Sequence, residues 1–179
     1  MLRILGGSAK GVSLKVPQSA RPSPVRLRKA LFDYLRYRFP PQGDPPSRGR
    51  FLDLYAGSGA IGLEAASEGF AATLVEKDRQ AITLLRENIQ KTRLPARLEP
   101  ISVEQFLLRA AQTGQRFQVA FMAPPYPHDL LLDFERLLEA RVVEPGGLLI
   151  LQHPVELSLP RGERREYGTN AVTMLESAG

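Results

Sequence analysis

The sequence contains no cysteine among its 179 residues and only two histidines. The absence of cysteine excludes a disulfide scaffold, a cysteine-ligated zinc or iron–sulfur site and any mechanism with a cysteine nucleophile. Two histidines do not supply a histidine-rich metal site, so we expect no metal. No apolar run approaches the roughly 18 residues of a membrane helix, and the first ten residues lack a stretch of signal-peptide type. We therefore expect a cytoplasmic protein without membrane contact.

Acidic residues are scarce at one end of a chain whose composition is otherwise ordinary. Hydrophobic residues make up 43% and charged residues 24%, and the length predicts about one domain. Residues 1–50 hold 11 Lys and Arg against 2 Asp and Glu, whereas residues 51–179 hold 13 against 17. The net charges are therefore +9 and −4. This asymmetry indicates an anionic partner of the N-terminal segment, unless the positive charges form only a solvated face.

The basic segment is predicted to form a hairpin followed by a helix. Turn signals at Gly6-Gly7 and Lys10-Gly11 indicate a β-hairpin over residues 2–16. Ser23 is the expected helix N-cap, with Pro24 at the first helical position. Apolar residues at helical spacing over 27–35 leave a basic side. Residues 40–50 are rich in proline and glycine and predict a linker, so we expect an N-terminal extension over 1–49 and a main domain over 50–179.

The main domain alternates between predicted strands and helices. Strands are expected at 51–54, 72–75, 97–101, 117–122 and 148–151, and helices at 60–68, 79–92, 103–112 and 128–140. Alternation predicts an α/β fold whose mostly parallel sheet is covered on both faces. Two further strands, 164–167 and 171–175, would end the sheet with an antiparallel hairpin. This arrangement is characteristic of the Rossmann-like class I methyltransferase fold.

A glycine-rich turn follows the first strand of the main domain, in the run Asp53-Leu54-Tyr55-Ala56-Gly57-Ser58-Gly59. Gly57 and Gly59 permit a tight turn and close approach of a ligand to the backbone. Ligands of such sheets bind at the carboxyl ends of the strands. Glu76 ends the next strand, where its carboxylate can accept both hydroxyl protons of a ribose. These residues predict a site for a nucleotide-like cofactor.

The identity of the cofactor depends on Asp53. Gly62 completes a G-x-G-x-x-G pattern, which would fit the pyrophosphate of a dinucleotide. Asp53, however, lies four residues before Gly57, where it would face the ligand. S-adenosylmethionine has no phosphate and carries an ammonium group that a carboxylate attracts. We therefore favour S-adenosylmethionine over a dinucleotide; the structural alternative is an empty turn, capped by Asp53, with Glu76 as a solvated charge.

A second signature, Met122-Ala123-Pro124-Pro125-Tyr126, ends the fourth strand, because two prolines cannot continue a central ladder. The run resembles the Asp/Asn-Pro-Pro-Tyr/Phe motif of amino-group methyltransferases, which implies catalytic positions at Ala123, Pro124, Pro125 and Tyr126. In that motif the target amine donates to the acidic or amide side chain and to the first proline's carbonyl, while the base stacks on the aromatic ring. Ala123 removes the side-chain acceptor, which leaves both a slow enzyme and an inactive one open. His128 is either a partial replacement or a solvated helix-start residue.

Nearly the whole chain resembles the RsmD-type 16S rRNA (guanine-N2)-methyltransferases. The blocks that carry the resemblance are Arg3 to Gly7 with Lys10-Gly11, Leu14 to Pro17, Arg21-Pro22-Ser23, Arg28 to Phe32, Asp53 to Gly59 with Gly62 to Ala65, Val75 to Asp78, and Tyr167-Gly168. The resemblance implies methyl transfer from S-adenosylmethionine to the N2 amine of one guanine. It also implies 16S rRNA, or an assembling small ribosomal subunit, as the partner. One compact domain makes us expect a monomer.

The resemblance assigns further residues. Lys77, and Ser102 with Val103 after the third strand, would complete the cofactor site. Ser102 stands where the family usually has an Asp near the adenine, and its hydroxyl would be the weaker acceptor. The residues expected to contact RNA phosphates are Lys10, Arg21, Arg26, Arg28 and Lys29. Other departures from the family pattern are Lys29, Gln118 and the Gln152-His153 pair.

Two alternatives stay open from the sequence. A catalytically impaired homologue that only binds rRNA would explain Ala123, and it predicts salt-sensitive RNA binding without turnover. A DNA adenine-N6 methyltransferase shares the Pro-Pro-aromatic signature. It usually needs a target-recognition region, for which this short chain has no obvious room.

Overall fold

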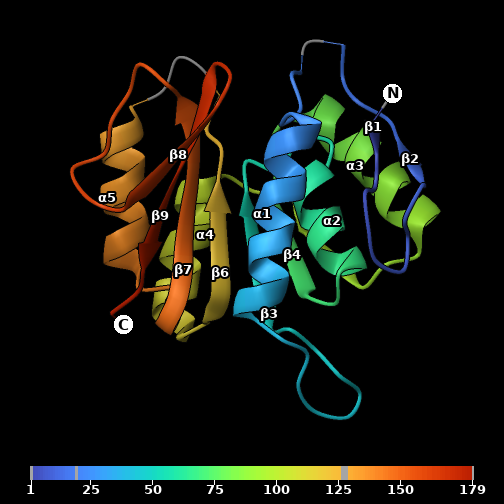
Figure 1. Cartoon of the computed structure of the whole chain (residues 1–179), viewed down its shortest axis with the longest axis horizontal. Coiled ribbons are helices and arrows are strands. Elements are labelled where there is room, and N and C mark those ends of the chain that lie inside the picture. Colours follow the sequence, from blue (N-terminus) through green and yellow to red (C-terminus); the bar gives the residue numbers. More distant parts are fainter. Residues whose placement is uncertain (1, 19, 126–128, 179) are drawn as a thin grey trace.

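The structure is a computed structural model that describes residues 2–18, 20–125 and 129–178. Its main sheet has the strand order β5-β4-β3-β6-β7-β9-β8 (Figure 1). The strands are β3 (Arg50–Leu54), β4 (Ala71–Val75), β5 (Ala96–Glu99), β6 (Phe117–Met122), β7 (Val143–Pro154), β8 (Glu163–Tyr167) and β9 (Asn170–Glu176). The helices are α1 (Val25–Arg38), α2 (Ala60–Ser67), α3 (Arg79–Thr92), α4 (Val103–Thr113) and α5 (Leu130–Ala140).

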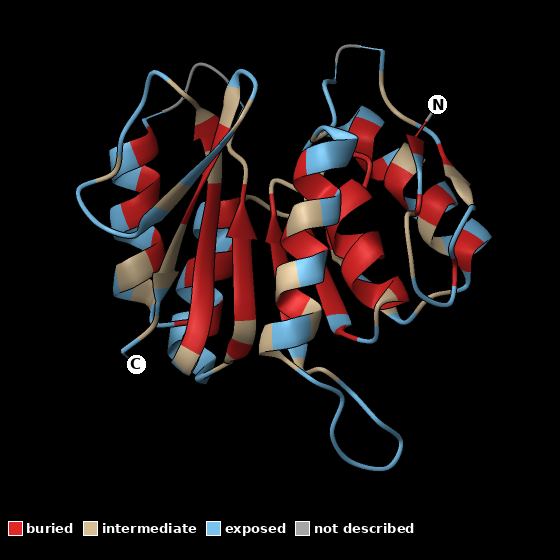
Figure 2. Cartoon of the chain, viewed as in Figure 1, coloured by how far each residue is buried: buried red, intermediate tan, exposed pale blue. Residues whose placement is uncertain are grey.

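The pairing of the strands confirms the fold predicted from the sequence. Strands β5, β4, β3, β6 and β7 pair in parallel, and β9 pairs antiparallel with both β7 and β8. Parallel neighbours require crossover connections, and the helices that make them cover both faces of the sheet. Side chains of α1 and α2 pack on one face, and those of α4 and α5 pack on the other. In Figure 2 the central strands are almost wholly buried, as expected for a sheet between two helical layers.

Strand β7 is much longer than the predicted 148–151. The prediction missed its first half because Pro145, Gly146 and Gly147 argue against a strand. The ladder with β6 is irregular there: Phe117 pairs with Val143, but Val119 already pairs with Leu148. Pro145 therefore lies in a bulge, where no ladder hydrogen bond is required of it. The extended strand carries its carboxyl end to Pro154, beyond the predicted limit.

The N-terminal extension begins with the predicted hairpin, in which β1 (Leu2–Arg3) pairs antiparallel with β2 (Ser13–Leu14). Leu2 and Leu14 are buried in a cluster with Leu63, Leu74 and Leu85 of the main body. Helix α1 buries its apolar side in a second cluster that includes Phe51 and Phe121. The extension therefore shares its core with the main body. None of the helices in the described ranges is long and apolar enough to cross a membrane.

The start of α1 corrects one local expectation. Pro24, not Ser23, is the N-cap, and no side chain caps this end of the helix. The Ser23 hydroxyl instead donates to the Gln152 side chain on β7, at 2.5 Å. The predicted linker is a loop between α1 and β3 that projects at the bottom of Figure 1, on the far side from the carboxyl ends of the parallel strands. Arg48 anchors its base by donating to the carbonyl oxygens of Phe39 and Glu68.

Candidate functional site

A cavity of about 750 Å³ lies at the carboxyl ends of the parallel strands. The ends of β3 and β4 form one half, and the ends of β6 and β7 with the start of β9 form the other. The segment before α1 also contributes to the wall, through Pro17 and Ala20 to Ser23. The sequence-predicted residues among its described lining are Asp53, Tyr55, Ala56, Gly57, Ser58, Glu76, Lys77, Val103, Ala123, Pro124, Pro125 and Arg21. A pocket of this size can hold a small ligand together with a single base.

The glycine turn after β3 has the conformation that its sequence predicts. Gly57 and Gly59 have φ angles of +57° and +88°, in the left-handed region that favours glycine. Gly59 is the N-cap of α2, and a Cβ there would lie 2.6 Å from Leu85 Cδ1. Nothing lies within 4 Å of a Cβ built on Gly57, so the backbone faces open space there. Gly59 therefore shapes the turn, whereas Gly57 leaves room beside it.

Asp53 is fully buried beneath this turn. Its Oδ2 accepts a hydrogen bond from the Gly62 backbone amide at 2.8 Å. Burial raises the pKa of the Asp53 carboxyl to about 7, and the neighbouring charge of Glu76 acts in the same direction. Gly62 is required by packing, because a Cβ there would lie 2.5 Å from Leu74 Cδ2. The G-x-G-x-x-G pattern is thus explained by a helix that approaches Asp53 and β4 closely.

Glu76, at the end of β4, binds three backbone amides. Its Oε1 accepts from Gly57 at 2.8 Å, and its Oε2 accepts from Lys77 at 3.0 Å and Asp78 at 2.9 Å. A carboxylate offers about four acceptor positions, so capacity remains for a ligand hydroxyl. The same carboxylate therefore fixes the turn and lines the cavity.

The charged residues around this half of the cavity are mostly acidic. Among the described lining residues they are Asp53, Glu76, Asp78 and Glu104, against Lys77 alone. Such a wall repels a pyrophosphate and attracts a cationic ligand. The Tyr55 ring also lines this half, and its hydroxyl donates to Asp133 Oδ1 at 3.3 Å. Burial and the Asp133 charge raise the pKa of Tyr55, so the phenol stays neutral.

The other half of the cavity begins where β6 ends. Ala123, Pro124 and Pro125 line it directly after Met122. Gln152, His153 and Asn170 face it from β7 and β9. The sequence singled out Gln152-His153 only as a departure from the family pattern and did not identify Asn170. A signal did exist, because the carboxyl end of the strand beside β6 has to reach the same edge of the sheet.

His153 is buried between β7 and β9. Its Nε2 lies 2.8 Å from Thr173 Oγ1, and its Nδ1 lies 2.9 Å from the Pro154 carbonyl oxygen. Because a carbonyl oxygen can only accept, Nδ1 carries the hydrogen and Nε2 accepts from the Thr173 hydroxyl. Burial lowers the pKa of His153, which keeps the ring neutral. Both nitrogens are engaged, so His153 braces the wall of the cavity.

Two residues predicted for the cofactor site lie outside the described lining of the cavity. Ser102 is one of them; it is the N-cap of α4, and its Oγ accepts from the Gln105 amide at 3.1 Å. Gly59 also lies outside that lining and acts through the shape of the turn. Tyr126 and His128 lie outside the described residues, so the stacking role of Tyr126 stays a prediction.

Arg28 corrects the predicted set of RNA contacts. Its side chain is 1% exposed, and its guanidinium lies 3.6 Å from Glu64 Oε1, which is as deeply buried. Glu64 also accepts the backbone amides of Leu5 and Gly6 at 2.8 and 3.0 Å. Arg28 further donates to the Arg3 carbonyl oxygen. Arg28 therefore joins the hairpin, α1 and α2 and is not available to a phosphate.

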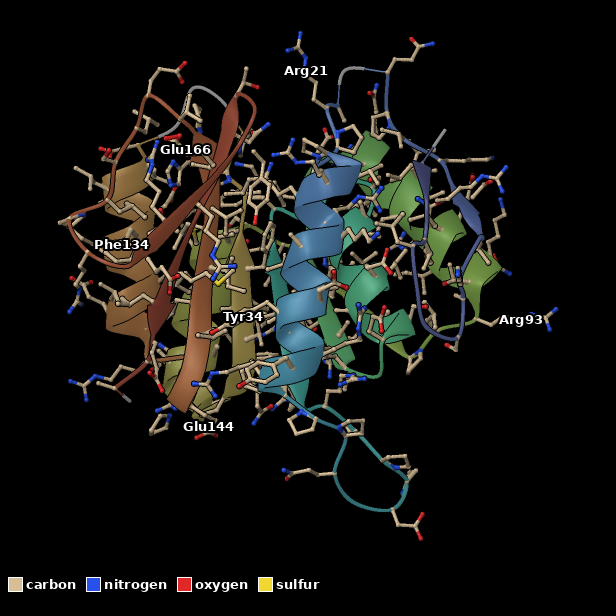
Figure 3. The ribbon with its side chains drawn as sticks, viewed as in Figure 1. Arg21, Tyr34, Arg93, Phe134, Glu144 and Glu166 are labelled. Atoms are coloured by element: carbon tan, nitrogen blue, oxygen red, sulfur yellow. The ribbon has the colours of Figure 1, made fainter. Side chains whose placement is uncertain are left out.

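The remaining predicted contacts, Lys10, Arg21, Arg26 and Lys29, are exposed. No ion pair within the described residues involves any of them. Arg21 lines the mouth of the cavity and projects outward at the top of the molecule (Figure 3). Cations without internal partners are free to bind an external anion.

Comparison with known proteins places this chain in a family. A family model described as conserved hypothetical protein 95 matches residues 2–175. Ribosomal RNA small subunit methyltransferase D of Escherichia coli (strain K12) is 36% identical, over 89% of this chain and 78% of its own length. YlbH of Bacillus subtilis (strain 168) is 30% identical over 99% of this chain and its full length.

A solved structure of a hypothetical protein from Thermus thermophilus superimposes with a TM-score of 0.93. It is 61% identical to this chain and covers 99% of it, and this chain covers all of that structure. The match to the family model extends across the basic extension, the glycine turn and the end of β6. The chain therefore belongs to the conserved hypothetical protein 95 family, the RsmD-type ribosomal RNA methyltransferases.

Proposed function

We propose that this protein transfers a methyl group from S-adenosylmethionine to the exocyclic N2 amine of a guanine in the 16S rRNA of the small ribosomal subunit. One observation carries the proposal. A single cavity joins an acidic, glycine-bounded half at the ends of β3 and β4 to a half formed by Ala123, Pro124 and Pro125. The name of the Escherichia coli relative supports the ribosomal RNA substrate.

The first half of the cavity fits this cofactor. Glu76 has acceptor capacity for ribose hydroxyls, and Gly57 leaves open space beside the turn. The acidic wall favours the positive charges of an ammonium and a sulfonium group. The cofactor supplies an electrophilic methyl group on a sulfonium sulfur. Val103 and Lys77 would complete the walls of this half.

The second half would hold the target base outside its RNA helix, because an enzyme cannot reach an amine inside a base-paired stack. Pro124 would offer its carbonyl oxygen to the amine, and Tyr126 would stack on the base, as the sequence predicts. Positioning is the main contribution, since an aryl amine becomes nucleophilic when its lone pair is aimed at the methyl group. The amine loses its extra proton readily after transfer, so no general base is required.

The basic extension would hold the RNA. Lys10, Arg21, Arg26 and Lys29 are exposed and lack internal partners among the described residues, and Arg21 stands at the mouth of the cavity. Their contacts to phosphates would supply affinity without sequence information. Free 16S rRNA and an assembling small subunit are both candidate substrates. A ribosomal RNA substrate also implies a cytoplasmic location, and we propose that the protein acts as a monomer.

Radiolabelled S-adenosylmethionine tests the proposal. The protein is incubated with small subunits and 16S rRNA from cells that lack the modification, and with duplex DNA as a control substrate. We expect label in the ribosomal RNA at a single site and none in DNA. Label in DNA would support the adenine-N6 alternative. Binding of RNA and cofactor without transfer would support the impaired homologue.

A further inference from the structure

The exocyclic amine of a base needs hydrogen-bond acceptors before it can react. Its nitrogen lone pair is delocalised into the ring, and acceptors for its two N–H groups fix the orientation in which the lone pair meets the methyl group. The methyl side chain of Ala123 cannot accept a hydrogen bond. If the proposed function is right, a polar atom elsewhere on the second half of the cavity has to serve.

Gln152 is placed to do this. Met122, the last residue of β6, pairs with Leu151 on β7, so Ala123 directly follows β6 at the position beside Gln152 of β7. Neighbouring strands lie about 4.8 Å apart. Residues Phe121 and Ile150 belong to the cluster beneath α1, and Ala123 packs against the same cluster. Because side chains alternate along a strand, Ala123 and Gln152 emerge on the same face of the sheet, and both line the cavity.

The Gln152 amide is held at both of its polar atoms. Its Oε1 accepts from the Ser23 hydroxyl at 2.5 Å, and its Nε2 donates to Asn170 Oδ1 at 3.4 Å. An amide oxygen has two lone pairs, and Ser23 uses one of them. No other hydrogen bond within the described residues uses the second lone pair, and Gln152 lines the cavity with its side chain already oriented. Such a group stabilises a transition state without the cost of reordering.

We propose that Gln152 supplies the side-chain acceptor for the reacting amine, in place of the acceptor that Ala123 lacks. The amine would donate one N–H to Gln152 Oε1 while its nitrogen bonds to the methyl carbon. The carbon–sulfur bond breaks with its electron pair passing to sulfur, and the extra proton then leaves to water. Gln152 takes up no proton in this step. Ser23 and Asn170 act as positioning residues that orient the amide.

The test compares Gln152→Ala with the wild type on small subunits, with rescue by a second substitution. Removal of one preorganised polar contact lowers kcat by about 10²- to 10³-fold. We expect that loss in Gln152→Ala, with an unchanged Kd for S-adenosylmethionine by calorimetry. The double variant Ala123→Asn/Gln152→Ala regains a side-chain acceptor at the end of β6, beside β7. Its kcat should be at least about tenfold higher than that of Gln152→Ala. Gln152→Glu retains an acceptor and should stay active. It serves as the test variant if Gln152→Ala folds poorly.

The controls separate this proposal from the proposed function. Gln90→Ala removes the same side chain from an exposed position on α3 and should leave kcat unchanged. Wild-type protein that transfers no methyl group to ribosomal RNA would overturn the proposed function and this inference with it. An active wild type together with a fully active Gln152→Ala variant would overturn the inference alone. The inference would also be overturned if the Ala123→Asn/Gln152→Ala variant showed no gain in kcat over Gln152→Ala while Ala123→Asn by itself was active.

Discussion

The Glu76 Oε1 accepts the backbone amide of Gly57 at 2.8 Å and thereby joins the end of β4 to the glycine turn after β3. The two residues are 19 positions apart in the sequence, and both line the cavity. A side chain that binds the turn before any ligand arrives gives a preorganised site, and preorganisation lowers the cost of binding.

Substitution of Glu76 should therefore impair cofactor binding. Glu76→Gln replaces one acceptor oxygen with a donor, which then faces the amides of Lys77 and Asp78 or of Gly57. We expect the Kd for S-adenosylmethionine to rise at least about tenfold, since a hydrogen bond to a charged group contributes about 1.5–3 kcal/mol. Titration calorimetry measures this change. The matched control Glu139→Gln, on the exposed side of α5, should bind as the wild type does.

Asp53 should make both stability and cofactor affinity depend on pH. Its folded-state pKa of about 7 lies above the ordinary value of 3.8. A carboxyl with a raised pKa contributes stability that is fully present below about pH 3.8 and is lost as the pH rises to about 7. Asp53→Asn removes this dependence while Asn can still accept the Gly62 amide. Denaturant unfolding at pH 5 and pH 8 should show a smaller difference for the variant than for the wild type.

The affinity for S-adenosylmethionine should change with pH in the opposite direction. Ionised Asp53 attracts the ammonium group, so the wild-type Kd should fall as the pH rises through about 7. Asp53→Asn should flatten this profile. An equally steep profile in the variant would show that another group controls binding.

The buried ion pair of Arg28 and Glu64 should stabilise the fold, and neither side chain should contact RNA directly. Removing one partner of a buried ion pair costs about 3–5 kcal/mol, because the other charge stays buried without compensation. We expect that loss in the unfolding free energy of Arg28→Met. Arg28→Met combined with Glu64→Gln should recover much of it, because no isolated charge is then buried. Equal stability of Arg28→Met and wild type would contradict the buried pair.

The exposed cations should determine how RNA binding responds to salt. Each lost phosphate contact reduces the slope of log affinity against log salt concentration by about 0.7–0.9. We expect this reduction, and weaker binding, for Arg21→Ala, Arg26→Ala and Lys29→Ala. Filter binding at several salt concentrations measures it. Arg93→Ala makes the same change of charge at the right-hand edge of Figure 3, away from Arg21 at the top. This variant should leave the slope unchanged.

Much of the fold could be predicted because its signals are local. Strand β6 and helix α3 were placed at their observed limits by apolar runs and by helical spacing. The first half of β7 was missed because Pro145 and Gly147 argue against a strand, and only the bulge opposite β6 accommodates them. The sequence grouped Arg28 with the other cations of the basic extension as an RNA contact. Its spacing to Phe32 and Leu35, at i+4 and i+7, places it on the buried side of α1.

The conformation of the glycine turn could be predicted because residue type determines it, as the positive φ angles of Gly57 and Gly59 show. The second half depends on contacts between distant segments. Ser23 and Gln152 are 129 residues apart, and only the paired ends of β6 and β7 bring Gln152 beside Ala123. The capping box of Ser102 was not anticipated, although Gln105 stands three residues after it, at the spacing such a box requires.

The nucleoside that carries the methyl group tests the central claim most directly. Small subunits methylated with labelled S-adenosylmethionine are digested to nucleosides and separated by chromatography with mass detection. The proposed chemistry predicts N2-methylguanosine as the single labelled product, derived from one position of the 16S rRNA. Label in N6-methyladenosine, or no label from protein that binds both RNA and S-adenosylmethionine, would contradict it.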